Sequence, residues 1–140
     1  MIIADTGFFV ALANRDDRDH QAAVTALGGL REGLVTTWPV VTETTHLLAN
    51  RLGADALLAF VASARAGAFE IFELSTAHWP RIEALMKQYS DLPMDLADAS
   101  LVLLAENQND GRVLSTDRRD FRTYRWKQRK PFKNLLDLSD

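Results

Sequence analysis

Four acidic residues stand where carboxylates do chemistry in α/β proteins: Asp5, Glu43, Asp98 and Asp117. Asp5 closes an apolar run, Asp117 closes the strand-like stretch 112–117, and Glu43 and Asp98 fall near the starts of predicted helices. Because ligands bind outside the carboxyl ends of parallel strands, we expect all four to meet at one sheet edge. Crowded carboxylates need divalent cations, and all-oxygen ligation selects Mg²⁺ or Mn²⁺ over zinc. Such ions activate water and clamp phosphates, so the pattern predicts phosphodiester hydrolysis.

The stretch 92–105 strengthens this interpretation, because it predicts a helix that is apolar on nearly every side. At about 100° per residue, Asp98 shares a face with Leu101 and Val102, whereas Asp95 points about 60° away toward the polar side with Glu106. A buried carboxylate is costly without a partner, and residues 92–108 contain no lysine or arginine. A metal ion is therefore a candidate partner. The alternative is that these acids only favour helix N-termini, as Asp5 also could by capping the helix after it.

The elements that must position these acids alternate along the chain. Strands are predicted at residues 1–6, Leu34–Thr37, Phe69–Leu74, Arg112–Asp117 and, at an edge, Phe132–Leu138. Helices are predicted at Phe8–Ala13, His20–Leu27, Pro39–Leu52, Ala54–Ala66, Ser75–Tyr89 and 92–105. This alternation predicts an α/β protein, a three-layer sandwich with a mainly parallel sheet. The length of 140 residues predicts a single domain over residues 1–140.

Composition narrows the class further. Apolar content of 47% and charged content of 25% are ordinary for a globular protein. The absence of cysteine excludes disulfides and thiolate metal sites. The apolar runs are too short to span a bilayer, so we expect a cytoplasmic protein with no membrane partner.

The segment 118–133 is strongly basic. It holds eight of the 16 lysine and arginine residues and one acid, so it carries +7 while the rest of the chain carries −10. This asymmetry indicates an anionic partner, and we interpret the segment as a platform for a nucleic-acid backbone. The residues predicted to contact that backbone are Arg118, Arg122, Arg125, Lys127 and Arg129. Trp126 could either stack an unpaired base or pack in the core, and Phe121, Tyr124 and Phe132 could anchor the last strand in the core.

These motifs together resemble the PIN domain. The resemblance rests on Asp5-Thr6 after an apolar strand, Glu43 in the second strand–helix unit, Asp98 in Ala97-Asp98-Ala99, and Asp117 in the run 115–121. It covers the whole chain, and the run 120–125 is most similar to VapC-type toxins of toxin–antitoxin pairs. The resemblance implies a four- or five-stranded parallel sheet and the activity of a Mg²⁺-dependent endoribonuclease. It also implies that the protein is a homodimer and that an antitoxin silences it.

Mapped onto this chain, the four acidic positions of that family are Asp5, Glu43, Asp98 and Asp117, which the resemblance makes both catalytic and metal-binding. Thr6 and Thr116 match its supporting hydroxyls. Asp95 and Asp120 are extra acids that could bind metal or only tune the electrostatic field.

Rival functions need features that this chain lacks. A haloacid-dehalogenase-like phosphatase needs a second aspartate two residues after Asp5, where Gly7 stands, and a response-regulator receiver needs a late lysine where Thr116 and Asp117 stand. Glu43 and His46 form only half of a di-iron motif. The alternative that stays open is a non-catalytic RNA-binding or regulatory module with a structural acidic cluster, which metal-dependent cleavage would separate from a nuclease.

Overall fold

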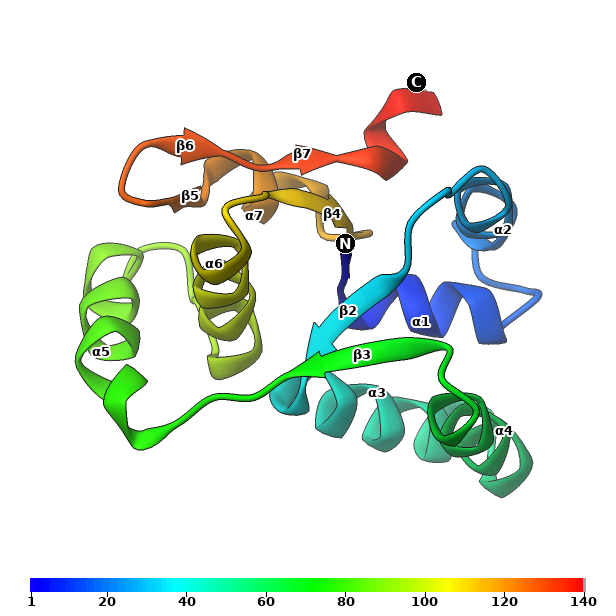
Figure 1. The fold of residues 1–140 in the computed structure, drawn as a ribbon. Coiled ribbons are helices and arrows are strands. Elements are labelled where there is room, and N and C mark those ends of the chain that lie inside the picture. The colour runs from blue at the N-terminus through cyan, green and yellow to red at the C-terminus, as the bar shows by residue number, and fades with distance from the viewer. Residues whose placement is uncertain (140) are drawn as a thin grey trace.

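A parallel sheet of five strands forms the centre of the computed structural model, which describes residues 1–139 (Figure 1). The strand order is β3-β2-β1-β4-β7, and every neighbouring pair is parallel. The strands are β1 (Ile2–Ala4), β2 (Leu34–Thr37), β3 (Phe69–Phe72), β4 (Arg112–Leu114) and β7 (Lys133–Asn134). A separate antiparallel hairpin pairs β5 (Arg125–Trp126) with β6 (Lys130–Pro131). The predicted α/β class and mainly parallel sheet are confirmed.

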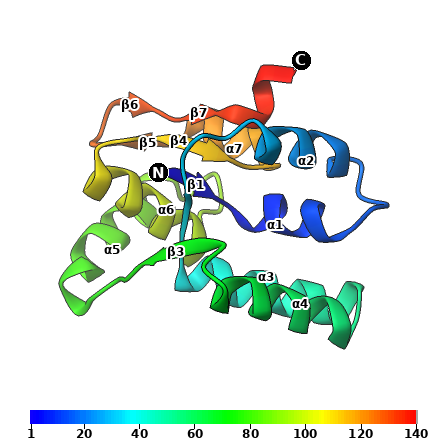
Figure 2. The ribbon, with the colours of Figure 1, turned by 45° about the vertical axis from the view of Figure 1, so that its right-hand side comes forward.

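Helices cover both faces of this sheet and give the predicted three layers (Figure 2). The helices are α1 (Thr6–Ala13), α2 (His20–Gly28), α3 (Trp38–Arg51), α4 (Ala54–Arg65), α5 (Trp79–Gln88), α6 (Leu96–Gln108) and α7 (Arg118–Thr123), with short 3₁₀ turns η1 (Thr76–His78) and η2 (Leu135–Ser139). Right-handed crossovers put α1, α3 and α4 on one face and α5 and α6 on the other. No helix among residues 1–139 is long and apolar enough to cross a membrane.

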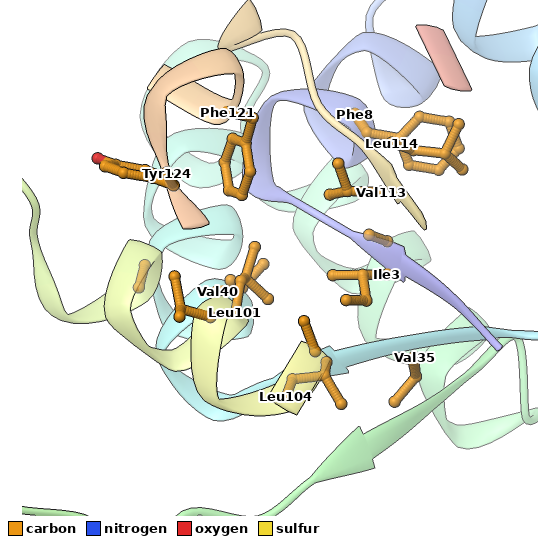
Figure 3. Packing of buried hydrophobic residues seen from close by; sticks show 14 of the residues in the cluster. Ile3, Phe8, Val35, Val40, Leu101, Leu104, Val113, Leu114, Phe121 and Tyr124 are labelled. Atoms are coloured by element: carbon orange, nitrogen blue, oxygen red, sulfur yellow. The ribbon is translucent and has the colours of Figure 1, made fainter. Parts of the chain in front are cut away.

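The core lies on both faces of the sheet, and one part of it is formed by β1, β4 and helix α6 (Figure 3). Ile3 and Val113 face each other in the β1–β4 register and are fully buried. Leu101 and Leu104 of α6 are buried as well, which explains why that helix is apolar on nearly every side. Strands buried on both faces read as continuous apolar runs, which is why the first residues of the chain predict a strand.

Local signals in the sequence set most element boundaries. Pro39 lies in the first turn of α3, where a missing N–H costs nothing, and Gly53 follows its end with a positive φ of 96°. The predicted edge strand 132–138 is shorter than expected, because only Lys133–Asn134 pairs and the chain then turns into η2. Asp140, included in the predicted domain, lies outside the described residues, and the single-domain organisation stays a prediction.

The topology places β1 at the reversal of the strand order. The chain builds β1, β2 and β3 outward in one direction, and β4 then pairs on the other side of β1. In open α/β sheets, such a reversal opens a crevice outside the carboxyl ends of the strands. Asp5 directly follows β1 at this crevice, and the chain beyond β4 leads to Asp117.

Candidate active site

A cavity of about 380 Å³ collects the acids that the sequence singles out. All four predicted site acids line it, together with both predicted hydroxyl residues. The other charged lining residues are Asp17, Arg51, Asp95 and Asp120. Seven carboxylates and one guanidinium therefore surround a single hollow.

Asp5 is fixed by two hydrogen bonds from different elements. Its Oδ1 accepts from the backbone N–H of Thr6 at 2.8 Å, which makes it the N-cap of α1. Its Oδ2 accepts from the Ser115 hydroxyl at 2.8 Å. Burial raises the pKa of Asp5 to about 6, while these two hydrogen bonds lower it and the charges of Glu43 and Asp95 raise it further. Asp5 thus caps a helix and also belongs to the acidic cavity.

Asp98 and Asp95 form a reciprocal pair at the start of α6. The Asp98 N–H donates to Asp95 Oδ1 at 2.8 Å, and the Asp95 N–H donates to Asp98 Oδ2 at 3.3 Å. The Tyr124 hydroxyl also donates to Asp98 Oδ2, at 3.1 Å. Burial, then the charges of Asp95 and Asp5, raise the pKa of Asp98 to about 8.

Asp95 is exposed, as predicted, but the helix face assigned to it is wrong. The helical spacing put it toward the polar side with Glu106, but α6 begins at Leu96 and Asp95 is its N-cap. A cap residue has extended backbone, so the angle of 100° per residue does not apply to it. Its side chain lines the acidic cavity, whereas Glu106 pairs with Arg81 at 2.8 Å.

Ser115 is a site residue that the sequence analysis missed. Besides donating to Asp5, its hydroxyl accepts from the Asp117 N–H at 2.9 Å, so it joins the ends of β1 and β4. Its backbone is held in turn by Asn134 of β7, whose side chain accepts from the Ser115 N–H at 3.2 Å and donates to the Ser115 carbonyl at 2.8 Å. Ala4 lies opposite Leu114, so one more step in register brings Asp5 level with Ser115.

The two hydroxyl residues that were predicted also line the cavity. Thr6 Oγ1 is buried and has no hydrogen-bond partner within residues 1–139. Gly7 lets the first turn of α1 approach the end of β4, because a Cβ at this position would lie only 1.8 Å from Thr116 Oγ1. The close approach of α1 to the end of β4 therefore depends on Gly7, the residue that stands where a haloacid-dehalogenase-like phosphatase has its second aspartate.

Glu43 and Asp117 complete the set from opposite sides of the cavity. Glu43 lies on α3 with Leu47 and Arg51, and their spacing of four residues puts all three on the face that lines the cavity. Asp117 follows β4 at the exposed rim. Partial burial, then a hydrogen bond with Asp120 and the charge of that residue, raise the pKa of Asp117 to about 7.

Comparison with known proteins identifies the family of this chain. The model of the PIN domain family matches residues 2–127. The chain belongs to the PIN domain family. Ribonuclease VapC26 of Mycobacterium tuberculosis is 31% identical over 124 residues, which cover 89% of this chain and 92% of that protein. The crystal structure of VapC20 from the same organism, described as a Sarcin-Ricin loop cleaving toxin, has a TM-score of 0.77 at 20% identity, covering 84% of this chain and 90% of that one. The VapC-type resemblance is thus confirmed, and the catalytic and metal-binding roles of the four acids stay predictions.

The donor set of this PIN domain fits a hard divalent cation. The lining groups nearest the buried acids are carboxylates and hydroxyls, which offer oxygen alone. Burial, together with neighbouring carboxylates, raises the pKa values of Asp5 and Asp98, and Thr6 Oγ1 has no hydrogen-bond partner among residues 1–139. Within residues 1–139, no three His, Cys, Asp or Glu side chains already stand close enough to enclose a metal ion. The donors fit such a cation in chemical kind, although the described side chains do not already enclose one.

The basic segment is more engaged with the protein itself than its sequence indicated. Arg118 pairs with Asp19 at 3.2 Å and with Asp137 at 3.1 Å, and Arg122 pairs with Asp137 at 3.5 Å. Arg125 donates to three backbone carbonyls, and Lys127 Nζ donates to the Asn109 side chain at 2.8 Å. Arg129 is exposed on the turn between β5 and β6. RNA binding by these residues stays a prediction.

Of the two alternatives for Trp126, the structure shows the core position and not the exposed stacking residue. Its side chain is only 7% exposed, and its Nε1 donates to the Pro131 carbonyl at 3.0 Å. The ring packs against Gly111, where an added Cβ would lie 2.2 Å from Nε1. Phe121 and Tyr124 are core residues, as the alternative interpretation of the segment expected.

Proposed function

We propose that this PIN domain is a Mg²⁺-dependent endoribonuclease and the toxin of a toxin–antitoxin pair. The observation that carries the proposal is the cavity in which Asp5, Glu43, Asp98 and Asp117 converge at the carboxyl edge of the sheet. The name of the VapC26 relative supports RNA as the substrate, and the description of VapC20 supports a toxin. Hydrolysis of a phosphodiester needs charge stabilisation and an activated water, which this set of oxygen ligands suits.

In this proposal the four acids hold Mg²⁺ or Mn²⁺, and the bound ion supplies Lewis-acid stabilisation of the scissile phosphate and an activated water. The chain's own groups fix the acids. The Ser115 hydroxyl and the Thr6 N–H orient both oxygens of Asp5, and the Tyr124 hydroxyl orients Asp98. Such supporting partners set the direction of the ligand lone pairs and limit their motion.

The remaining parts of the proposal concern partners. The substrate is RNA, a cognate antitoxin protein silences the enzyme in the cytoplasm, and the active form is a homodimer. The single domain of residues 1–140 would contain the whole site. Light scattering of the purified protein checks the dimer, and copurification with the product of a neighbouring reading frame checks the antitoxin.

Cleavage of a labelled RNA with and without divalent cations tests the central claim. We expect wild type to cut internally in Mg²⁺ or Mn²⁺ and to be silent in excess EDTA. Asp98→Asn should abolish cleavage while its circular dichroism matches wild type. Asp91→Asn is the matched control, because Asp91 is exposed and is not part of the cavity lining.

Two outcomes would overturn the proposal. Full cleavage in EDTA would refute the requirement for a metal ion. Full cleavage by Asp98→Asn would refute the catalytic role of the acid cluster. RNA binding without cleavage under any divalent cation would instead favour the non-catalytic module.

A further inference from the structure

A second hollow of about 630 Å³ adjoins the acidic cavity. It lies between the start of α3 and the start of α6, and the two hollows share Glu43 and Asp95 as lining residues. Its other lining residues are Trp38, Pro39, Thr42, His46, Leu96 and Ala97. Unlike the acidic cavity, its wall is mainly apolar and contains an aromatic ring.

Trp38 is the prominent member of this wall. It is the first residue of α3, directly after β2, and its side chain is 54% exposed. Leu96, the first residue of α6, is 38% exposed across the hollow. The helix start is rigid, because Pro39 follows Trp38 and the Thr42 hydroxyl donates to the Trp38 carbonyl at 3.0 Å. An exposed indole on a constrained backbone therefore stands beside the acids.

The other two tryptophans cannot take this place. Trp126 is buried against Gly111. Trp79 is 60% exposed, but it lies on α5 in a different hollow. The acid in the wall of that hollow is Glu83, which does not line the acidic cavity. Trp38 is thus the exposed tryptophan that shares a wall with the acidic cavity.

We propose that the hollow around Trp38 binds an unpaired base of the RNA strand whose phosphate lies among the four acids. Proteins recognise single-stranded RNA by splaying bases onto aromatic side chains, and a base is joined covalently to the phosphate beside it. The shared wall of Glu43 and Asp95 places the apolar surface where a neighbouring base would fall. This inference rests on the proposed ribonuclease function and adds the base-binding subsite to it.

Binding measured without cleavage tests the subsite. The probe is a fluorescein-labelled single-stranded oligoribonucleotide, and the protein carries Asp98→Asn so that the RNA stays intact. Adding Trp38→Ala should weaken binding roughly 5- to 100-fold, the range for loss of one base–aromatic stack. Trp38→Phe should restore most of the affinity because it keeps a ring. Trp79→Ala is the matched control and should leave the affinity unchanged, since it removes an equally exposed indole elsewhere.

A double-mutant cycle links the ring to one base. A series of oligoribonucleotides, each lacking one base, should contain one position whose removal weakens binding to the Trp38 protein. The same removal should cost little further affinity in Trp38→Ala, because the two changes delete the same contact. The variant should retain the wild-type urea midpoint, since Trp38 is exposed.

Three results would overturn the subsite. The first is an unchanged affinity in Trp38→Ala, and the second is equal losses at every abasic position. The third is a Trp38→Ala protein whose molecular mass by light scattering falls and whose affinity loss is the same at every position of the oligonucleotide. That result would make this face an interface between copies of the chain. Cleavage by wild type in Mg²⁺ is scored separately, so failure of the ribonuclease proposal is distinguishable from failure of the subsite.

Discussion

The stability of the metal-free protein should fall as pH rises, which is unusual for a set of aspartates. Carboxyls in ion pairs have lowered pKa values and stabilise a fold above the unfolded pKa. Asp5 has the opposite shift, because burial raises its pKa from 3.8 to about 6. The folded state therefore binds more protons than the unfolded state between these values. This contribution is fully present below about pH 4 and is lost as pH rises through about 6.

The magnitude follows from the shift. A difference of about 2.2 pH units at about 1.36 kcal/mol each amounts to about 3 kcal/mol for Asp5. About half of it, ~1.4 kcal/mol, falls between pH 5 and pH 8. Asp98 and Asp117 have raised pKa values and act in the same direction. Glu32 and Asp110 have lowered pKa values from pairing with Arg112, so measurements should stay above pH 5, where both are ionised.

Urea unfolding in EDTA at several pH values between 5 and 8 measures this slope. Wild type should lose at least about 1.4 kcal/mol of unfolding free energy over the range, and Asp5→Asn should lose about that much less. Asp91→Asn should follow wild type, because it lies away from the cavity. Mg²⁺ should stabilise wild type more at pH 8 than at pH 5, since protons compete with the ion for the same oxygens. A flat or rising wild-type curve, or an identical slope in Asp5→Asn, would refute the reasoning.

Two further predictions concern the residues around the acids. Ser115→Ala and Tyr124→Phe should each lower cleavage roughly 10- to 100-fold, because they remove the hydrogen bonds that orient Asp5 and Asp98. Tyr89→Phe is the control, since the Tyr89 hydroxyl accepts a hydrogen bond from the Arg125 N–H and does not contact the acids. Equal losses in all three variants would point to a packing effect. Neutralising Arg125, Lys127 and Arg129 together should reduce the slope of log affinity against log salt by about one unit and not by three, because two of these side chains already contact the protein. A loss near three units would mean that RNA displaces those contacts.

The sequence predicted the fold because its signals are local and agree with one another. The range Leu34–Thr37 was predicted as a strand and is one, since the apolar run ends where Pro39 opens a helix. The convergence of the acids also followed from local position, because strand ends and helix starts in a parallel sheet share one edge. These inferences needed only the period of the pattern and the order of the elements.

The errors arose where the position of a side chain depends on contacts with a distant part of the chain, or on the residue at which a helix begins. Asp95 was assigned to a helix face because the predicted helix began four residues too early, before Pro93. The pattern Asp95-x-x-Asp98 was the available signal, since an acid three residues after a cap can return a hydrogen bond. The sequence left Trp126 undecided between the surface and the core, because the contact that buries it comes from Gly111, on the approach to β4. Ser115 could be chosen over Thr116 only from the β1–β4 register.

The acidic site and the fold are mutually dependent, because the hydrogen bonds that orient the acids come from distant elements. Asp5 after β1 needs Ser115 after β4, and Ser115 is held by Asn134 of β7, the outermost strand of the sheet. Asp98 at the start of α6 needs Tyr124, which follows α7. The orientation of Asp5 therefore depends indirectly on β7, through Asn134 and Ser115. It follows that an edge residue such as Asn134 acts on the site through Ser115 without lining the cavity, while the buried acids in turn weaken the metal-free fold.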